Sequence, residues 1–192
     1  MDKTTMKISP YDLPYKTVTA VIEHHHGVYI LHMHETTNKV EILIPSMSSG
    51  ETLFEFENTT NHAAYMAVSD QYVVAYRPIA STRRELLIYD RCSKELKYQP
   101  VDVPHRVTFL ENDDLLAASG HRLIKYRIVD GVAVHLWTTE LQNIISFCSG
   151  PHGLIYGSTR STKSIYIISP SGEKLHEFTH DQLPGATTGQ IS

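Results

Sequence analysis

Cysteine is scarce in this sequence of 192 residues, which contains only Cys92 and Cys148. Two cysteines are too few for the disulfide framework of a small secreted domain or for a zinc site built from four thiolates. A reducing compartment is the simplest interpretation, and we expect a cytoplasmic protein. Cys148 ends an apolar run, so we expect it to be a small buried residue rather than a nucleophile.

Long hydrophobic runs are missing as well. No stretch approaches the roughly 18 apolar residues of a membrane-spanning helix, and residues 1–7 lack the apolar core of a signal peptide. Charge of one sign is not in large excess, because the formal net charge is -4 at pH 7. These features argue against a membrane partner and against a wholly basic nucleic-acid-binding protein.

Helical periodicity is also lacking, and an internal repeat of short apolar strands takes its place. In each repeat, four strands follow one another, with a tight turn, a variable loop and a polar turn between them. The third strands are predicted at 40–44, 86–90, 123–128 and 165–168, and the fourth at 53–56, 96–98, 132–137 and 175–178. The first strands should begin near Thr17, Ala63, Arg106 and Asn143, a spacing typical of four-stranded propeller blades.

The repeat predicts an all-β fold, namely a β-propeller of four four-stranded antiparallel blades that forms part of a larger propeller. A closed ring of four blades is the alternative. The predicted blades are residues 17–60, 61–104, 105–141 and 142–180. Residues 1–16 would be an N-terminal segment that supplies an outer strand of a preceding blade, and residues 181–192 a C-terminal tail.

The turns between third and fourth strands carry a family resemblance. Residues 87–91 read Leu-Ile-Tyr-Asp-Arg, and residues 169–175 read Ser-Pro-Ser-Gly-Glu-Lys-Leu. In this pattern the chain resembles the NHL-type propellers that end tripartite-motif proteins and, more loosely, WD-repeat propellers. The resemblance implies RNA as an alternative partner, bound through a positively charged face. It does not imply ubiquitin-ligase activity, because two cysteines cannot form RING or B-box zinc modules.

Charged residues divide between the two ends of the predicted sheets. Because neighbouring strands alternate in direction, the loops from second to third strands and from blade to blade lie on one side, here called the loop face. The remaining turns lie on the opposite side, here called the turn face, and carry most of the acidic residues. The residues predicted to bind a partner on the loop face are Arg83, Arg84, Arg106, His121, Arg122, Arg160 and Lys163.

These features predict a non-enzymatic interaction scaffold that binds a protein or peptide through a basic loop face. An RNA-binding propeller of NHL type is one alternative, and a metal-dependent propeller hydrolase is another. The predicted first strands offer no cluster of carboxylates for such a hydrolase. We therefore expect no catalytic residues, no metal, no cofactor and no membrane partner.

Histidines occupy positions 24–26, 32 and 34. Imidazole is a good ligand for zinc, copper and nickel, which suggests a metal site. With a turn at residues 26–27, however, His24 should lie opposite Tyr29, and His32 opposite Val21. The two groups would then be roughly 10 Å apart along the ladder, too far to share one ion.

Overall fold

The computed structural model describes residues 17–25, 27–34, 37–43, 50–57, 65–78, 84–101, 106–119, 121–141, 144–159 and 163–179. Regular structure in these ranges is β-strand, apart from one 3₁₀ turn, η1 (Pro151–Gly153). No helix in the described ranges is long and apolar enough to span a membrane. The predicted segments 1–16 and 181–192 lie outside them.

The strands form four antiparallel sheets, each with its four strands in sequence order. The first sheet contains β1 (Thr17–His24), β2 (Gly27–His34), β3 (Thr37–Leu43) and β4 (Glu51–Glu57), and the second contains β5 (Tyr65–Val68), β6 (Tyr72–Pro78), β7 (Arg84–Asp90) and β8 (Leu96–Pro100). The third contains β9 (Arg106–Phe109), β10 (Leu115–Ser119), β11 (Arg122–Val129) and β12 (Val132–Glu140), and the fourth contains β13 (Ile144–Ser149), β14 (Ile155–Thr159), β15 (Ser164–Ile168) and β16 (Lys174–Thr179).

Side-chain patterns explain which strands lie inside and which lie at an edge. Consecutive residues Val73, Val74 and Ala75 of β6 are all fully buried, because both faces of this strand pack against neighbouring sheets. In β4, an outer strand, Phe54 and Phe56 are buried while the charged residues between and beside them are exposed. This alternation is typical of a strand with one packed face.

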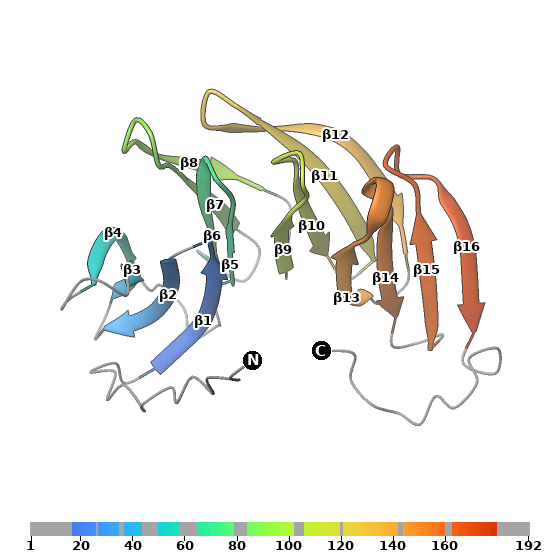
Figure 1. Cartoon of the computed structure of the whole chain (residues 1–192), viewed down its shortest axis with the longest axis horizontal. Helices are drawn as coiled ribbons and strands as arrows, with labels where there is room; N and C mark the ends of the chain where they lie inside the picture. The colour runs from blue at the N-terminus through green and yellow to red at the C-terminus, as the bar shows by residue number, and fades with distance from the viewer. Residues whose placement is uncertain are drawn as a thin grey trace, which may run out of the picture.

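The four sheets are arranged as a fan (Figure 1), in which β1, β5, β9 and β13 line the inner side of an arc and the fourth strands lie on the outer side. Each sheet packs its face against the next one, and the innermost strands β1, β5 and β9 are neighbours. The predicted all-β architecture with four four-stranded antiparallel sheets is therefore confirmed.

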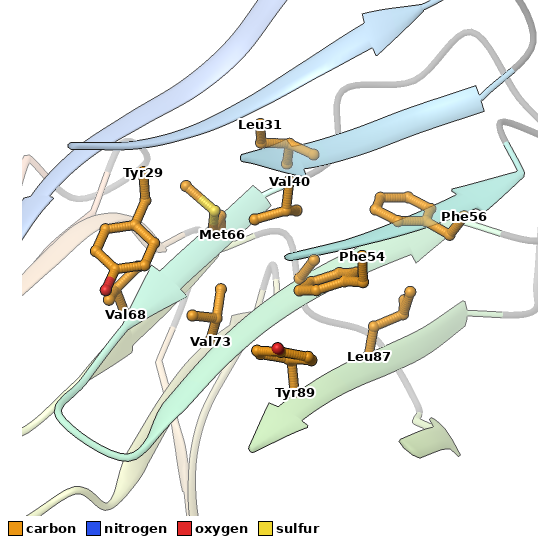
Figure 2. Close-up of a cluster of buried hydrophobic side chains, with 11 residues drawn as sticks. Tyr29, Leu31, Val40, Phe54, Phe56, Met66, Val68, Val73, Leu87 and Tyr89 are labelled. Atoms are coloured by element: carbon orange, nitrogen blue, oxygen red, sulfur yellow. The ribbon is translucent and has the colours of Figure 1, made fainter. Parts of the chain in front are cut away.

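Three hydrophobic clusters fill the spaces between successive sheets. Figure 2 shows the first cluster, in which Leu31, Val40 and Phe54 of the first sheet face Leu87 and Tyr89 of the second. The rings of Phe54 and Tyr89 stack with centroids 5.4 Å apart. The second and third clusters join the second sheet to the third and the third to the fourth in the same way. These clusters hold neighbouring loops in fixed positions.

The register of the first hairpin differs from the prediction. His24 lies opposite Gly27 rather than Tyr29, and His32 lies opposite Val18 rather than Val21. The hairpin closes one residue earlier than expected because His25 adopts a left-handed backbone conformation with φ of 52°. A bulge between residues 18 and 20 shifts the register further.

The prediction that Cys148 is buried is wrong, because this cysteine and Cys92 are both exposed. Cys148 lies opposite Tyr156 in the ladder. Its side chain therefore projects from the face of the fourth sheet opposite to Ile155 and Gly157, which are buried in the packing against the third sheet.

Candidate functional site

Three predicted arginines begin strands at the loop face. Arg84 is the first residue of β7, Arg106 of β9 and Arg122 of β11. First and third strands of a blade run in the same direction, so their first residues lie at the same end of the sheets. The loop face of the second and third sheets therefore presents three guanidinium groups.

Of the other four predicted residues, two lie within the described ranges. His121 and Lys163 immediately precede β11 and β15, and both side chains are exposed. Lys163 adopts a left-handed φ of 49°. Arg83 and Arg160 lie outside the described residues.

Arg84 is held against the buried ring of Tyr76, the residue that sequence reasoning missed. The guanidinium carbon lies 5.9 Å from the ring centroid, and the backbone carbonyl of Arg84 accepts a hydrogen bond of 3.0 Å from the N–H of Val101. Tyr76 is only 3% exposed. Burial raises the pKa of its hydroxyl, while the positive charge of Arg84 opposes that rise.

Two polar atoms at this position are buried and form no hydrogen bond of normal geometry with any described residue. They are Nη1 of Arg84 and the hydroxyl oxygen of Tyr76. Such atoms are uncommon in folded proteins, because losing water without gaining a partner costs about 1–3 kcal/mol. A ligand that accepts a hydrogen bond here would recover part of this cost. The sequence signal was available, since Tyr76 lies near the end of β6 and Arg84 begins the next strand, β7.

Carboxylates on the loop face already neutralise some of its charge. Glu85 accepts hydrogen bonds from Arg77 at 2.8 and 3.1 Å. Glu140 lies 3.2 Å from Nε of Arg122, and both of these side chains are more than half exposed. An exposed pair of this kind contributes at most about 1 kcal/mol and can exchange partners. Within the described residues, Arg84 and Arg106 form no ion pair.

The turn face carries the opposite charge. Asp70, Asp90, Asp130 and Glu173 lie in or beside the turns on that side. Asp90 caps its own turn by accepting the N–H groups of Cys92 and Ser93 at 2.8 and 3.0 Å. These backbone hydrogen bonds, that of Ser93 being the larger influence, hold the pKa of Asp90 below its usual value. The described residues are thus more basic on the loop face than on the turn face.

No protein-family model matches the sequence, and neither does any curated protein. Solved structures do match its fold. A streptogramin B lyase has a TM-score of 0.60 and 18% identity over 90% of this chain and 57% of its own. A virginiamycin B lyase from Staphylococcus aureus has a TM-score of 0.61 and 17% identity, covering 88% of this chain and 56% of its own. Hydrazine synthase from Kuenenia stuttgartiensis has a TM-score of 0.63 and 10% identity, covering 91% of this chain and 52% of its own.

At these identities the likeness establishes the fold alone, and that fold is of β-propeller type. The chain spans little more than half the length of these neighbours. The comparisons support the propeller and no narrower resemblance, so they do not extend to the NHL type.

The comparisons correct one expectation. We predicted that the chain is not an enzyme, yet two solved neighbours with this fold are named as lyases. The prediction rested on the lack of a carboxylate cluster in the predicted first strands. The lack of one such cluster does not exclude catalysis, because catalytic groups can be grafted onto one scaffold in many ways.

Proposed function

We propose that the loop face of the second and third sheets binds an acidic segment of a protein or peptide. Arg84 and Arg106 would provide the principal contacts. The observation that carries this proposal is the buried pair of polar atoms at Arg84 and Tyr76, both without a hydrogen bond to a described residue.

A carboxylate suits this position chemically. An arginine donates two parallel hydrogen bonds to a carboxylate, and charge-assisted bonds of this kind are roughly twice as strong as neutral ones. The ring of Tyr76 already restricts the guanidinium of Arg84, so less side-chain entropy is lost on binding. Arg106 is exposed at the start of β9, the innermost strand of the third sheet, and would contact a second acidic residue.

Two features favour a peptide over RNA. Glu85 and Glu140 lie on the same face, and they would repel a continuous phosphate backbone more than a short segment with a few carboxylates. Single-stranded RNA is usually held by exposed aromatic rings that stack on bases. Tyr76 is buried and cannot serve as such a platform.

Fluorescence anisotropy with a labelled Glu/Asp-rich peptide tests the proposal, with a single-stranded RNA as the competing probe. The variants Arg84→Met and Arg106→Gln should each weaken peptide binding by about tenfold, the effect of losing one charge-assisted contact. Lys94→Asn is the matched control. Lys94 is an exposed cation on the turn face with φ of 62°, a conformation that asparagine tolerates.

The outcomes separate the candidates. Loss of peptide binding in the loop-face variants, with retention in the control, supports the proposal. Tighter binding of RNA, with a steep decrease at higher salt, would favour the RNA-binding alternative instead. An equal loss in all three variants would show nonspecific attraction, and absence of peptide binding by the unmodified chain would refute the proposal.

A further inference from the structure

Three side chains with metal-binding atoms meet on the turn face, between the first and second sheets. His24 ends β1, His25 follows in the hairpin turn, and Asp70 lies in the turn between β5 and β6. The Nε2 atoms of His24 and His25 lie 2.9 and 2.6 Å from the same oxygen, Oδ1 of Asp70. One ligand atom from each residue lies within 4.8 Å of the other two.

We propose that His24, His25 and Asp70 form a binding site for a divalent transition-metal ion of the zinc type. Two imidazoles and one carboxylate are a ligand set that Zn²⁺ accepts, with metal distances of about 2.0–2.2 Å and water completing a tetrahedron. Mg²⁺ and Ca²⁺ are disfavoured, because they prefer ligand sets made of oxygen atoms.

The observed distances are close to those of a tetrahedral site. Ligand atoms about 2.1 Å from one ion in a tetrahedron are separated by roughly 3.4 Å. The two imidazoles therefore need to withdraw from the carboxylate oxygen by less than 1 Å, relative to 2.9 and 2.6 Å. Such a movement is accessible, since the side chains of His25 and Asp70 are 66% and 71% exposed.

The backbone on both sides of the site is anchored. His25 has a left-handed φ of 52°, a conformation that costs an ordinary residue about 1 kcal/mol and directs its ring toward the second sheet. On the other side, Nη1 of Arg91 donates hydrogen bonds to the carbonyl oxygens of Ser69 and Asp70 at 2.9 and 2.8 Å. These bonds fix the turn that presents the carboxylate.

The ligands come from different sheets, which explains why the sequence concealed the site. Asp70 follows the histidines by about 45 residues, and only the packing of the first sheet against the second brings them together. In the sequence, His32 and His34 are the nearest candidate partners of these histidines, and His32 does not reach them. That residue is buried elsewhere in the first sheet, with Nε2 3.5 Å from a carboxylate oxygen of Glu41. Residue 26 and the side chain of His34 lie outside the described residues.

Titration of the metal-free chain with Zn²⁺ by calorimetry tests the site, and Co²⁺ serves as a spectroscopic probe. We expect a single Zn²⁺ per chain and, for Co²⁺, the intense visible absorption of a tetrahedral ion. Asp70→Asn, His24→Gln and His25→Asn should each weaken Zn²⁺ binding by more than roughly tenfold. Loss of a residue that only supports a metal ligand already weakens binding by about 10–100-fold, and loss of a ligand itself should have a larger effect. The matched controls are Asp130→Asn and His152→Asn. Both replace an exposed residue with a left-handed φ, 51° and 60° respectively, outside the site.

Asp70→Asn is the decisive variant. It preserves an oxygen that accepts a hydrogen bond from either histidine, so the turn keeps its shape, and it removes only the carboxylate charge and ligand. If Zn²⁺ binds this variant as tightly as the unmodified chain, consecutive histidines alone hold the ion and the proposed site is refuted. Equal losses in the control variants, or no binding by the unmodified chain, would also refute it. Circular dichroism of every variant separates loss of a ligand from loss of the fold.

Discussion

The carboxylate of Asp114 lies 2.9 Å from the ammonium group of Lys125, and both side chains are buried. They project from the face of the third sheet that packs against the fourth, beside Leu116 and Leu123 of the third hydrophobic cluster. Arg127 and the side chain of Asn112 donate further hydrogen bonds to the same carboxylate. These contacts connect the turn before β10, which contains Asp114, to Lys125 and Arg127 of β11.

Asp114→Asn should destabilise the chain by about 3–5 kcal/mol, the usual effect of removing one member of a buried ion pair. The loss arises because Lys125 remains buried without a counter-ion. Urea unfolding followed by circular dichroism measures the effect. Glu173→Gln, at an exposed position on the turn face, is the control and should change stability by less than about 0.5 kcal/mol. An equal, small effect in both variants would contradict the structural role of Asp114.

The same residue predicts a loss of stability in acid. Burial alone raises the pKa of Asp114, but hydrogen bonds from Arg127, Lys125 and Asn112 outweigh it and lower the pKa below its ordinary value. A carboxyl whose pKa is lower in the folded state stabilises the fold at pH values above its unfolded pKa of about 3.9, and that stability decreases as the pH falls further. The free energy of unfolding should therefore decrease below about pH 4.

Comparison of unfolding at about pH 6 and pH 3 checks this dependence. The decrease should be smaller in Asp114→Asn than in the unmodified chain. It should not vanish, because hydrogen bonds also lower the pKa of Asp70 and Asp90. An unchanged pH dependence in the variant would show that Asp114 does not contribute to it.

The fold could be predicted because its signals are local. In the outer strand β4, Phe54 and Phe56 alternate with exposed charges, and the polar turns between strands are visible in the sequence. The prediction for the register of the first hairpin was wrong, because the left-handed conformation of His25 and the bulge after Val18 have no signature in composition. The alternation of apolar residues identifies a strand more reliably than it identifies the strand's exact partner.

The candidate sites could be predicted only in part. The loop-face position of Arg84 follows from strand order, which the repeat revealed. Its contact with buried Tyr76 depends on side-chain packing that strand order does not specify. The meeting of His24 with Asp70 depends on two sheets packing together, across 46 residues of sequence. Side-chain contacts between blades cannot be predicted from the residue pattern of single strands.

Tyr76→Phe should leave stability unchanged or increase it by up to about 1 kcal/mol. The hydroxyl is buried without a hydrogen bond to a described residue, so removing it eliminates a desolvation penalty and leaves the packed ring in place. Thermal and urea unfolding measure the change. A decrease of more than about 1 kcal/mol would reveal a hydrogen-bond partner for the hydroxyl and remove the observation on which the proposed peptide site rests.

Leu87→Ala should destabilise the chain by about 2–5 kcal/mol, because it opens a cavity between the first and second sheets. Leu87 is fully buried in the cluster that Figure 2 shows. Leu136→Ala provides the matched control, since Leu136 is 39% exposed on the outer strand β12. The same change there should alter stability by less than about 1 kcal/mol. Similar losses in both variants would argue against the first cluster as a major source of stability.

Two glycines in turns allow the cost of backbone strain to be separated from the cost of a steric clash. Gly172, in the turn before β16, and Gly131, in the turn before β12, have left-handed φ values of 89° and 72°. Adding a methyl group at either position incurs a similar backbone cost of about 1–2 kcal/mol. The surroundings differ: a Cβ at Gly172 would lie 2.6 Å from the ring of Trp137, whereas one at Gly131 would lie 2.8 Å from Cδ of Lys97. The ammonium group of Lys97 donates a hydrogen bond of 2.6 Å to the carbonyl of Asp130, but the aliphatic chain behind it has several rotatable bonds and can shift more easily than a ring.

The ring of Trp137 cannot easily move aside. Its Nε1–H donates a hydrogen bond of 3.0 Å to the carbonyl of Pro170, and the hydroxyl of Thr139 donates one to the carbonyl of Gly172. Gly172→Ala should therefore cost about 1–3 kcal/mol more than Gly131→Ala, the usual range for overpacking. It should also change the fluorescence of Trp137, the single tryptophan of the chain. The two variants share the same backbone cost, so a difference in their stability must come from displacement of the Trp137 ring. If they unfold alike and the fluorescence of Trp137 is unchanged, the ring does not pack closely against the turn that contains Gly172.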